Sequence, residues 1–256
     1  MPRRPRIDFA GFHHIINRGV ARTDIYLCDI DKDKFLEILC KACKTYRVNL
    51  QDYCLMDNHY HLLVELTSEN LSLFMRQINS NYAIYFNKKY KRSGHLWQGR
   101  YKSYYIIGED YLFSLYRYIE HNPLEAKMSE YIGQYKFTLL ATLLQNDLDI
   151  IECAKHSQLI ELIKEEGILE HLGLRLSENE IDKLDLNEKR KISIDEYELK
   201  LYKSKSLDEH FEVCSTKAER NSAILSAIED GYTQADIAIY LNLSGSSISK
   251  IVNKNL

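Results

Sequence analysis

Two apolar periodicities alternate along the first 140 residues, and their order is the feature that most constrains the fold. Short apolar runs with β-branched residues predict strands at 11–19, 48–56, 61–66 and 101–107. Apolar spacing near 3.6 residues predicts helices at 31–46, 71–86 and 110–121. The turn-forming pair Asp57-Asn58 joins the middle two strands as an antiparallel hairpin. Pro123 is expected to stop the third helix near Asn122.

This order is strand, helix, strand, strand, helix, strand and a final helix. It predicts an α+β fold of the split βαβ, ferredoxin-like kind, with one antiparallel sheet and helices on one face. Residues 141–215 read as a helical and charged linker region, in which 176–205 is expected to be helical or flexible. Residues 216–256 contain three short helical segments separated by turns, which predicts a helix-turn-helix. We therefore expect domains at 1–140, 141–215 and 216–256.

The charge of the chain is unevenly distributed. The net charge of -3 argues against a nucleic-acid partner when taken as an average. Residues 1–138, however, carry 20 Lys and Arg against 15 Asp and Glu, whereas the remainder carries 14 against 22. The first segment is therefore the candidate for contact with phosphate. The sequence shows neither a membrane span nor a signal peptide, so a cytoplasmic, nucleoid-associated protein is expected.

The six cysteines lack the spacing of a disulfide framework. Cys40 and Cys43 form a lone CxxC inside an expected helix, and no second ligand pair completes a zinc site. We expect reduced cysteines that serve packing.

His59 and His61 are the most informative candidates for chemistry. On a strand they point to the same face while Tyr60 points to the other, so both imidazoles could share a metal ion. An isolated pair of this kind is more often simply exposed to solvent. A second pair lies on the expected third helix, where Tyr118 and Asn122 are four residues apart and share a face. Taken alone, Tyr118 is better explained by packing and Asn122 by a helix cap.

A basic segment follows the second expected helix. Residues 86–106 contain six cations and no acidic residue, interleaved with aromatic side chains that could stack on unpaired bases. The alternative is a solvated basic loop beside core aromatics. A basic arm at the N-terminus and the last helix of the expected helix-turn-helix could also contact DNA. The candidate DNA-binding residues are Lys88, Lys89, Lys91, Arg92, Trp97, Arg100, Tyr101, Lys102, Arg3, Arg4, Arg6, Ser246, Ser247 and Lys250.

Four motifs occur together in a characteristic order. They are NRG at 17–19, HYH at 59–61, LWQGRY at 96–101 and YIEHNP at 118–123. In this combination, residues 5–140 resemble the single-tyrosine HUH transposases, in particular the REP-associated tyrosine transposases. The resemblance implies that His59 and His61 bind a metal, that Tyr118 is the nucleophile and that Asn122 takes the place of the third ligand. Because Pro123 disfavours a helical Asn122, Glu120 and His121 remain alternative ligands.

The implied activity is metal-dependent cleavage and joining of single-stranded DNA near hairpins through a 5′-phosphotyrosine intermediate. Mg²⁺ or Mn²⁺ would be the cofactor, since the ligand set mixes imidazole with oxygen. The expected partners are single-stranded or hairpin DNA, with duplex DNA at the C-terminal helices, and the protein is expected to be a monomer or homodimer. The alternative is a non-catalytic DNA-binding regulator that retains the fold. A structural metal-binding protein is a third interpretation, but it leaves the basic aromatic segment unexplained.

Overall fold

The structure is a computed structural model. The model describes residues 9–106, 109–146, 148–165, 167–178, 180–181, 190–195, 198–203, 205–212, 214, 216–229, 232 and 234–254. The chain divides into two compact units, Met1–Leu184 and Asp185–Leu256, which are treated separately below. None of the described helices is long and apolar enough to cross a membrane.

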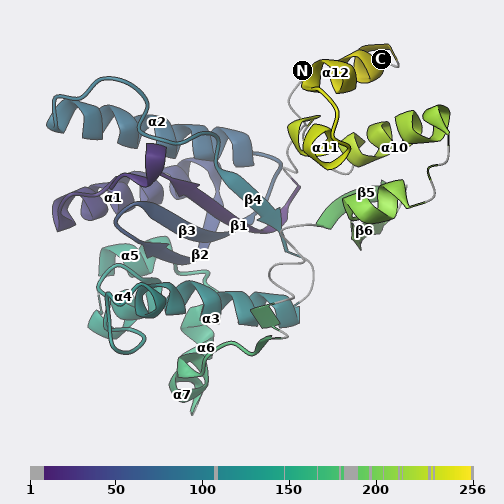
Figure 1. The fold of residues 1–256 in the computed structure, drawn as a ribbon. Helices are drawn as coiled ribbons and strands as arrows, with labels where there is room; N and C mark the ends of the chain where they lie inside the picture. Colours follow the sequence, from purple (N-terminus) through teal and green to yellow (C-terminus); the bar gives the residue numbers. More distant parts are fainter. Residues whose placement is uncertain are drawn as a thin grey trace. The chain divides into compact units, whose positions relative to one another are not determined.

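The first unit contains a four-stranded antiparallel sheet and the helices packed on it (Figure 1). The elements are β1 (Gly11–Arg18), the 3-10 turn η1 (Val20–Arg22), α1 (Asp29–Tyr46), β2 (Val48–Leu55), β3 (His59–Leu66), α2 (Leu71–Lys89), β4 (Lys102–Tyr105), α3 (Glu109–Glu125), α4 (Leu139–Gln145), α5 (Leu148–Cys153), α6 (Gln158–Leu162) and α7 (Ile168–Gly173). The strand order is β2-β3-β1-β4, and every neighbouring pair is antiparallel. The predicted split βαβ arrangement is therefore confirmed.

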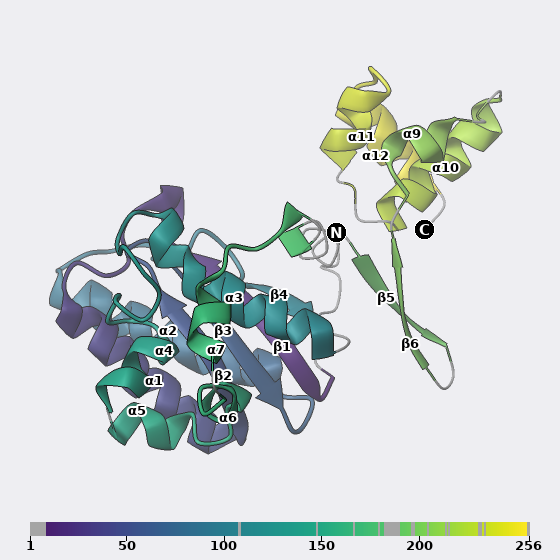
Figure 2. The same ribbon diagram turned by 90° about the horizontal axis from the view of Figure 1, so that it is seen from below.

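The four-stranded sheet has helices on both faces. The helices of the split βαβ units, α1 and α2, cover one face as expected, and α3 lies against the other face (Figures 1 and 2). Tyr60 of β3 points toward the α1 and α2 side, where its ring lies 4.9 Å from that of Phe35 and 5.7 Å from that of Trp97. His61 points the other way, and its ring lies 5.6 Å from that of Tyr118 on α3. The alternation predicted for residues 59–61 thus holds.

Helix α3 does not stop before Pro123, which corrects the expectation from the sequence. Pro123 lies inside the helix, which continues to Glu125. A proline in the last turn removes only one helical hydrogen bond, and Pro123 itself is buried. The Asn122 side chain also donates from Nδ2 to the Tyr118 carbonyl at 2.8 Å, which supports this turn. Asn122 therefore keeps the helical position that brings it to the same face as Tyr118.

Two further expectations need correction. Cys40 of α1 and Cys153 of α5 form a disulfide, with Cα atoms 5.4 Å apart, so these two cysteines are not reduced. Sequence spacing could not reveal this pair, because 113 residues separate its members. In the segment expected to be helical or flexible, residues 190–195 and 198–203 form an antiparallel hairpin of β5 (Arg190–Asp195) and β6 (Glu198–Lys203).

The second unit contains this hairpin and a group of short helices. The helices are α9 (Leu207–Phe211), α10 (Lys217–Glu229), α11 (Gln234–Tyr240) and α12 (Gly245–Lys254). The last three share a small apolar core that includes Ile224, Ile237 and Ile248, all fully buried. The helical segments expected in this region are present, and the assignment as a helix-turn-helix stays a prediction.

Candidate active site

One open cavity of about 630 Å³ gathers the residues that the motifs singled out. It lies between the end of β1, the start of β3, the segment before β4 and the last turns of α3. Its lining consists of Ile16, Asn17, Arg18, Arg22, Asn58, His59, His61, Gln98, Gly99, Arg100, Lys102, Tyr118 and Asn122. The four motifs, separated by up to about 100 residues of sequence, thus supply most of one lining.

The two imidazoles of β3 stand side by side in this cavity. The rings of His59 and His61 lie 5.2 Å apart, as expected for alternate positions on one strand. Burial lowers the pKa of His59, and the neighbouring Arg18, directly opposite on β1, lowers it further. Burial also lowers the pKa of His61 well below its usual value, with smaller contributions from His14 and His59. Both rings are therefore neutral near pH 7, the state in which imidazole binds metals.

Tyr118 and Asn122 enter the cavity from α3. The Tyr118 ring meets His61 edge-on at 5.6 Å and His14 at 6.0 Å, so the phenol sits next to the histidine pair. Asn122 uses its amide nitrogen for the Tyr118 carbonyl, which leaves its side-chain oxygen as the atom that could serve as a ligand. Two imidazoles and an amide oxygen on one cavity form a donor set that suits Mn²⁺ or Mg²⁺.

The alternative ligands face other surroundings. His121 is buried and its Nε2 lies 2.8 Å from the Leu172 carbonyl. Glu120 is buried beside Leu140, whose backbone N–H it accepts at 2.9 Å, and burial raises the pKa of its carboxyl to about 7. Neither residue lines the cavity. Within the part of the chain that the structure describes, no three His, Cys, Asp or Glu side chains group as metal ligands do.

Tyr116, another phenol on α3, faces the core. It is almost fully buried and donates to the Gln51 side-chain oxygen at 3.1 Å. Burial raises the pKa of Tyr116 well above the ordinary value, and the nearby Asp52 adds to this effect. A phenol that is inaccessible and hard to ionise is a poor nucleophile, so the geometry favours Tyr118 over Tyr116.

Four cations line the cavity. Arg100 and Lys102 were among the candidates from the sequence, whereas Arg18 and Arg22 were not. The motif NRG at 17–19 could have pointed to Arg18. Position 19 requires glycine, because a Cβ there would collide with the Thr23 carbonyl oxygen. The chain then turns sharply, because Ala21 and Arg22 both have a positive φ, 51° and 58°. Residues with a side chain rarely adopt this left-handed conformation. Here it brings Arg22 to the cavity.

The cations at the end of α2 do not line this cavity. Lys88, Lys91 and Arg92 are exposed, and Arg92 lies over the Phe86 ring. Lys89 is also exposed, but its Nζ lies 2.6 Å from the buried Asp31 carboxylate. The basic segment therefore divides into a cavity part, 98–102, and a part at the helix end, 88–92.

Several aromatic candidates serve the fold as well as the surface. Trp97 donates from its indole N–H to the Asn79 carbonyl at 2.9 Å, packs against Tyr60 and lines an adjoining cavity of about 530 Å³. Tyr101 is buried. In the second unit Ser246 and Lys250 of α12 are exposed and Ser247 is half-buried. The basic arm Arg3, Arg4 and Arg6 lies outside the described residues.

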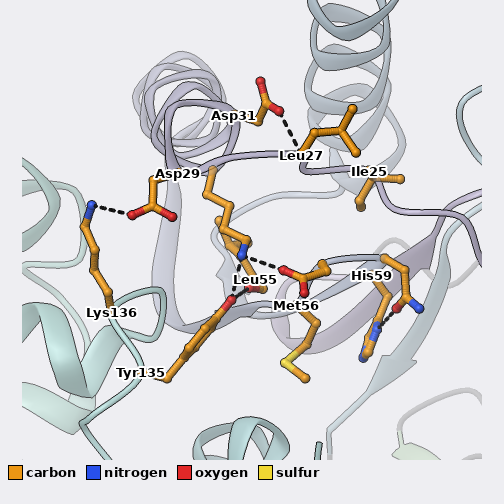
Figure 3. A network of polar contacts seen from close by, with 12 residues as sticks. Ile25, Leu27, Asp29, Asp31, Leu55, Met56, His59, Tyr135 and Lys136 are labelled. Atoms are coloured by element: carbon orange, nitrogen blue, oxygen red, sulfur yellow. Dashed lines mark hydrogen bonds and ion pairs between the residues drawn. The ribbon is translucent and has the colours of Figure 1, made fainter. Parts of the chain in front are cut away.

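The turn that starts β3 is held by a polar network (Figure 3). The buried Lys32 of α1 pairs with Asp57 at 2.7 Å and donates to the Tyr135 hydroxyl at 2.8 Å. Tyr135 in turn donates to the Leu55 carbonyl at 2.8 Å. The network fixes both sides of the β2–β3 turn, from which His59 projects, and thereby gives the candidate site a rigid base.

Comparison with known proteins agrees with the motifs. Residues 10–122 match the family described as transposase, IS200-like. The matched segment spans the whole four-stranded sheet, α1, α2 and most of α3. The resemblance to transposases drawn from the motifs is confirmed over this segment, which makes up less than half of the chain.

Two solved structures are similar to the chain. A REP-associated tyrosine transposase bound to a REP hairpin is 16% identical, with a TM-score of 0.45 over 54% of this chain and 81% of that one. A protein described as a transposase from Deinococcus radiodurans R1 is 19% identical, with a TM-score of 0.34 over 47% of this chain and 97% of that one. No curated protein matches the chain.

Proposed function

We propose that the protein cleaves and rejoins single-stranded DNA at the cavity of the first unit, with Tyr118 as the nucleophile. The observation that carries this proposal is the meeting of Tyr118, His59, His61 and Asn122 on one cavity. Membership of residues 10–122 in a transposase family supports DNA as the substrate.

The reaction follows from the side chains of the cavity. The Tyr118 hydroxyl attacks a backbone phosphorus in line and its proton passes to solvent, while the bond from phosphorus to the 3′ oxygen breaks and that oxygen takes up a proton from solvent. The products are a 5′-phosphotyrosyl bond and a strand with a free 3′-hydroxyl. A second 3′-hydroxyl can attack the same phosphorus and release the tyrosine, because the covalent link retains the energy of a phosphodiester. Strands can therefore be joined without an added energy source.

The metal-binding role of His59, His61 and Asn122 is part of the same proposal. When bound, Mn²⁺ or Mg²⁺ would polarise the scissile phosphate and neutralise the charge that develops on it. The chain itself contributes neutral imidazoles, a free amide oxygen and four cations around the cavity. Arg18, Arg22, Arg100 and Lys102 would hold the phosphates on either side of the cleaved bond.

A covalent-adduct assay tests the proposal. The full chain is incubated with Mn²⁺ and a pool of labelled single-stranded hairpin oligonucleotides that includes repeats flanking its gene, and adducts are resolved on a denaturing gel. Tyr118→Phe should abolish the adduct and leave DNA binding largely intact. Tyr104→Phe is the matched control, because this phenol is directly opposite His14 on β4. An adduct that persists in Tyr118→Phe would assign the nucleophile to another residue.

A DNA-binding regulator is the second candidate function. It is favoured by the separate C-terminal helices, whose last member α12 exposes Ser246 and Lys250. In this case the protein would bind an oligonucleotide from the pool tightly and form no adduct with it in the presence of metal. Loss of this binding on deletion of residues 216–256 would assign recognition to these helices.

A further inference from the structure

Each histidine of the pair on β3 has one ring nitrogen engaged by a protein group, and it is the same nitrogen in both rings. Nδ1 of His59 lies 2.7 Å from Oδ1 of Asn58. Nδ1 of His61 lies 3.0 Å from Nε2 of His14. A neutral imidazole has one N–H and one lone pair, so the partner of Nδ1 decides which nitrogen carries the lone pair.

Asn58 determines the tautomer of His59 directly. Its Nδ2 donates to the Arg22 carbonyl at 3.3 Å, which orients the amide so that Oδ1 faces His59. The opposite orientation would place two oxygens against each other. Because Oδ1 can only accept, Nδ1 of His59 must carry the hydrogen, and its Nε2 has the lone pair.

His14 acts on His61 from the neighbouring strand. It lies on β1 opposite Leu63 of β3, so it is the diagonal neighbour of His61, and the two rings are stacked with an interplanar angle of 17°. His14 is almost fully buried, with 4% of its surface exposed, so a positive charge on it is disfavoured. Two neutral imidazoles share one hydrogen in this contact, and the hydrogen can belong to either ring.

The charge around the cavity decides between these two arrangements. Arg18, Arg22, Arg100 and Lys102 line the same cavity as His61. If His14 donated, His61 would direct an N–H toward these cations. If His61 donates, it directs a lone pair toward them, which is the electrostatically favourable choice.

We infer that Asn58 and His14 are positioning residues that hold His59 and His61 as Nδ1–H tautomers, so that both Nε2 lone pairs are available to a metal ion in the cavity. This inference rests on the proposed function, in which these two histidines are metal ligands. Hydrogen bonds of this kind fix the ring orientation of metal-binding histidines and increase their basicity. The site is therefore preorganised by Asn58 and His14, which lie outside the motif HYH at 59–61.

The tautomers can be measured in the metal-free protein. Long-range proton–nitrogen NMR of the full chain labelled with ¹⁵N-histidine distinguishes protonated from unprotonated ring nitrogens. His59→Ala and His61→Ala assign the signals. We expect an unprotonated Nε2 in both rings. An Nε2–H tautomer in either ring of the metal-free protein would overturn the inference for that ring.

Binding of Mn²⁺ alone, measured by titration calorimetry, provides the second readout. His14→Leu removes the acceptor and should weaken Mn²⁺ binding by about 10-fold to 100-fold. His14→Gln offers an amide oxygen and should restore most of the affinity. In the same way Asn58→Ala should weaken binding, and Asn58→Asp, which keeps an acceptor oxygen, should not. Unchanged affinity in folded His14→Leu and Asn58→Ala would overturn the inference.

Failure of the inference is distinguishable from failure of the proposed function. If the double variant His59→Ala with His61→Ala binds Mn²⁺ as tightly as the original protein, the proposed metal ligands are wrong. The NMR measurement needs no metal and decides the tautomers in either case. If His14→Leu does not fold, as judged by circular dichroism, His14→Gln and the NMR spectrum of the unaltered chain still decide.

Discussion

Replacement of Arg117 by methionine tests how α3 is held in position. The Arg117 guanidinium pairs with Glu180 at 2.6 Å and donates to the carbonyls of Leu174 and Arg175, both at 2.7 Å. These three partners belong to the segment after α7, which thereby clamps the helix that carries Tyr118. Methionine preserves the apolar stem and removes every one of these contacts.

The expected loss follows from the burial of the two partners. Breaking a buried ion pair costs about 3–5 kcal/mol. Here Arg117 is 6% exposed but Glu180 is 24% exposed, and Glu180 keeps hydrogen bonds from Ser114 and Ser177. Because Glu180 is partly exposed, the loss should fall below this range, and we expect a free energy of unfolding reduced by about 2–3 kcal/mol. For a unit of this size that corresponds to a midpoint of thermal unfolding lower by roughly 5–10 °C.

The assay combines unfolding with the adduct measurement. Thermal and urea unfolding of Arg117→Met report stability, and adduct formation at a temperature where the variant is folded reports the placement of Tyr118. Glu180→Gln is the matched control and should lose less, because the glutamine oxygen still accepts from Arg117. A midpoint within about 1 °C of the unaltered protein would refute the reasoning.

The remaining predictions concern pH, the disulfide and phosphate contacts. Burial lowers the pKa of His14 to about 3, below its unfolded value of 6.5; its contribution to stability is thus present above pH 6.5 and lost as pH falls toward 3. Acid unfolding curves should show a loss of up to about 1.4 kcal/mol per pH unit that His14→Gln reduces, and an equal slope in both proteins would contradict the assignment. Reduction of the disulfide Cys40–Cys153, which spans 113 residues, should lower the free energy of unfolding by at most about 4–5 kcal/mol. Cys40→Ser should match the reduced protein and be insensitive to reductant, whereas sensitivity of that variant would point to another cause. Arg100→Gln should lower the salt dependence of single-stranded DNA binding by a slope of about 0.7, and Lys91→Gln, which lies off the cavity, should change it less. Equal effects of both would show that the DNA path includes the end of α2.

The sequence by itself determined the features that depend on neighbours along the chain. The order of periodicities predicted the antiparallel sheet and its two covering helices, because apolar spacing within one element reports which face is buried. The alternation at 59–61 placed His59 and His61 on one face and Tyr60 on the other, since that is a property of any strand. The spacing of Tyr118 and Asn122 likewise placed them on one side of α3.

Only the tertiary structure decided which residues meet across elements. His14 reaches His61 because β1 pairs with β3, and Arg18 lies opposite His59 for the same reason. These contacts join residues more than 40 positions apart, and no local pattern encodes such a distance. The continuation of α3 past Pro123 and the formation of the disulfide likewise depend on packing partners elsewhere in the chain. The sequence thus predicted which side chains share a face of a strand or helix. The order of the strands decided which residues, such as His14 and Arg18, lie beside them.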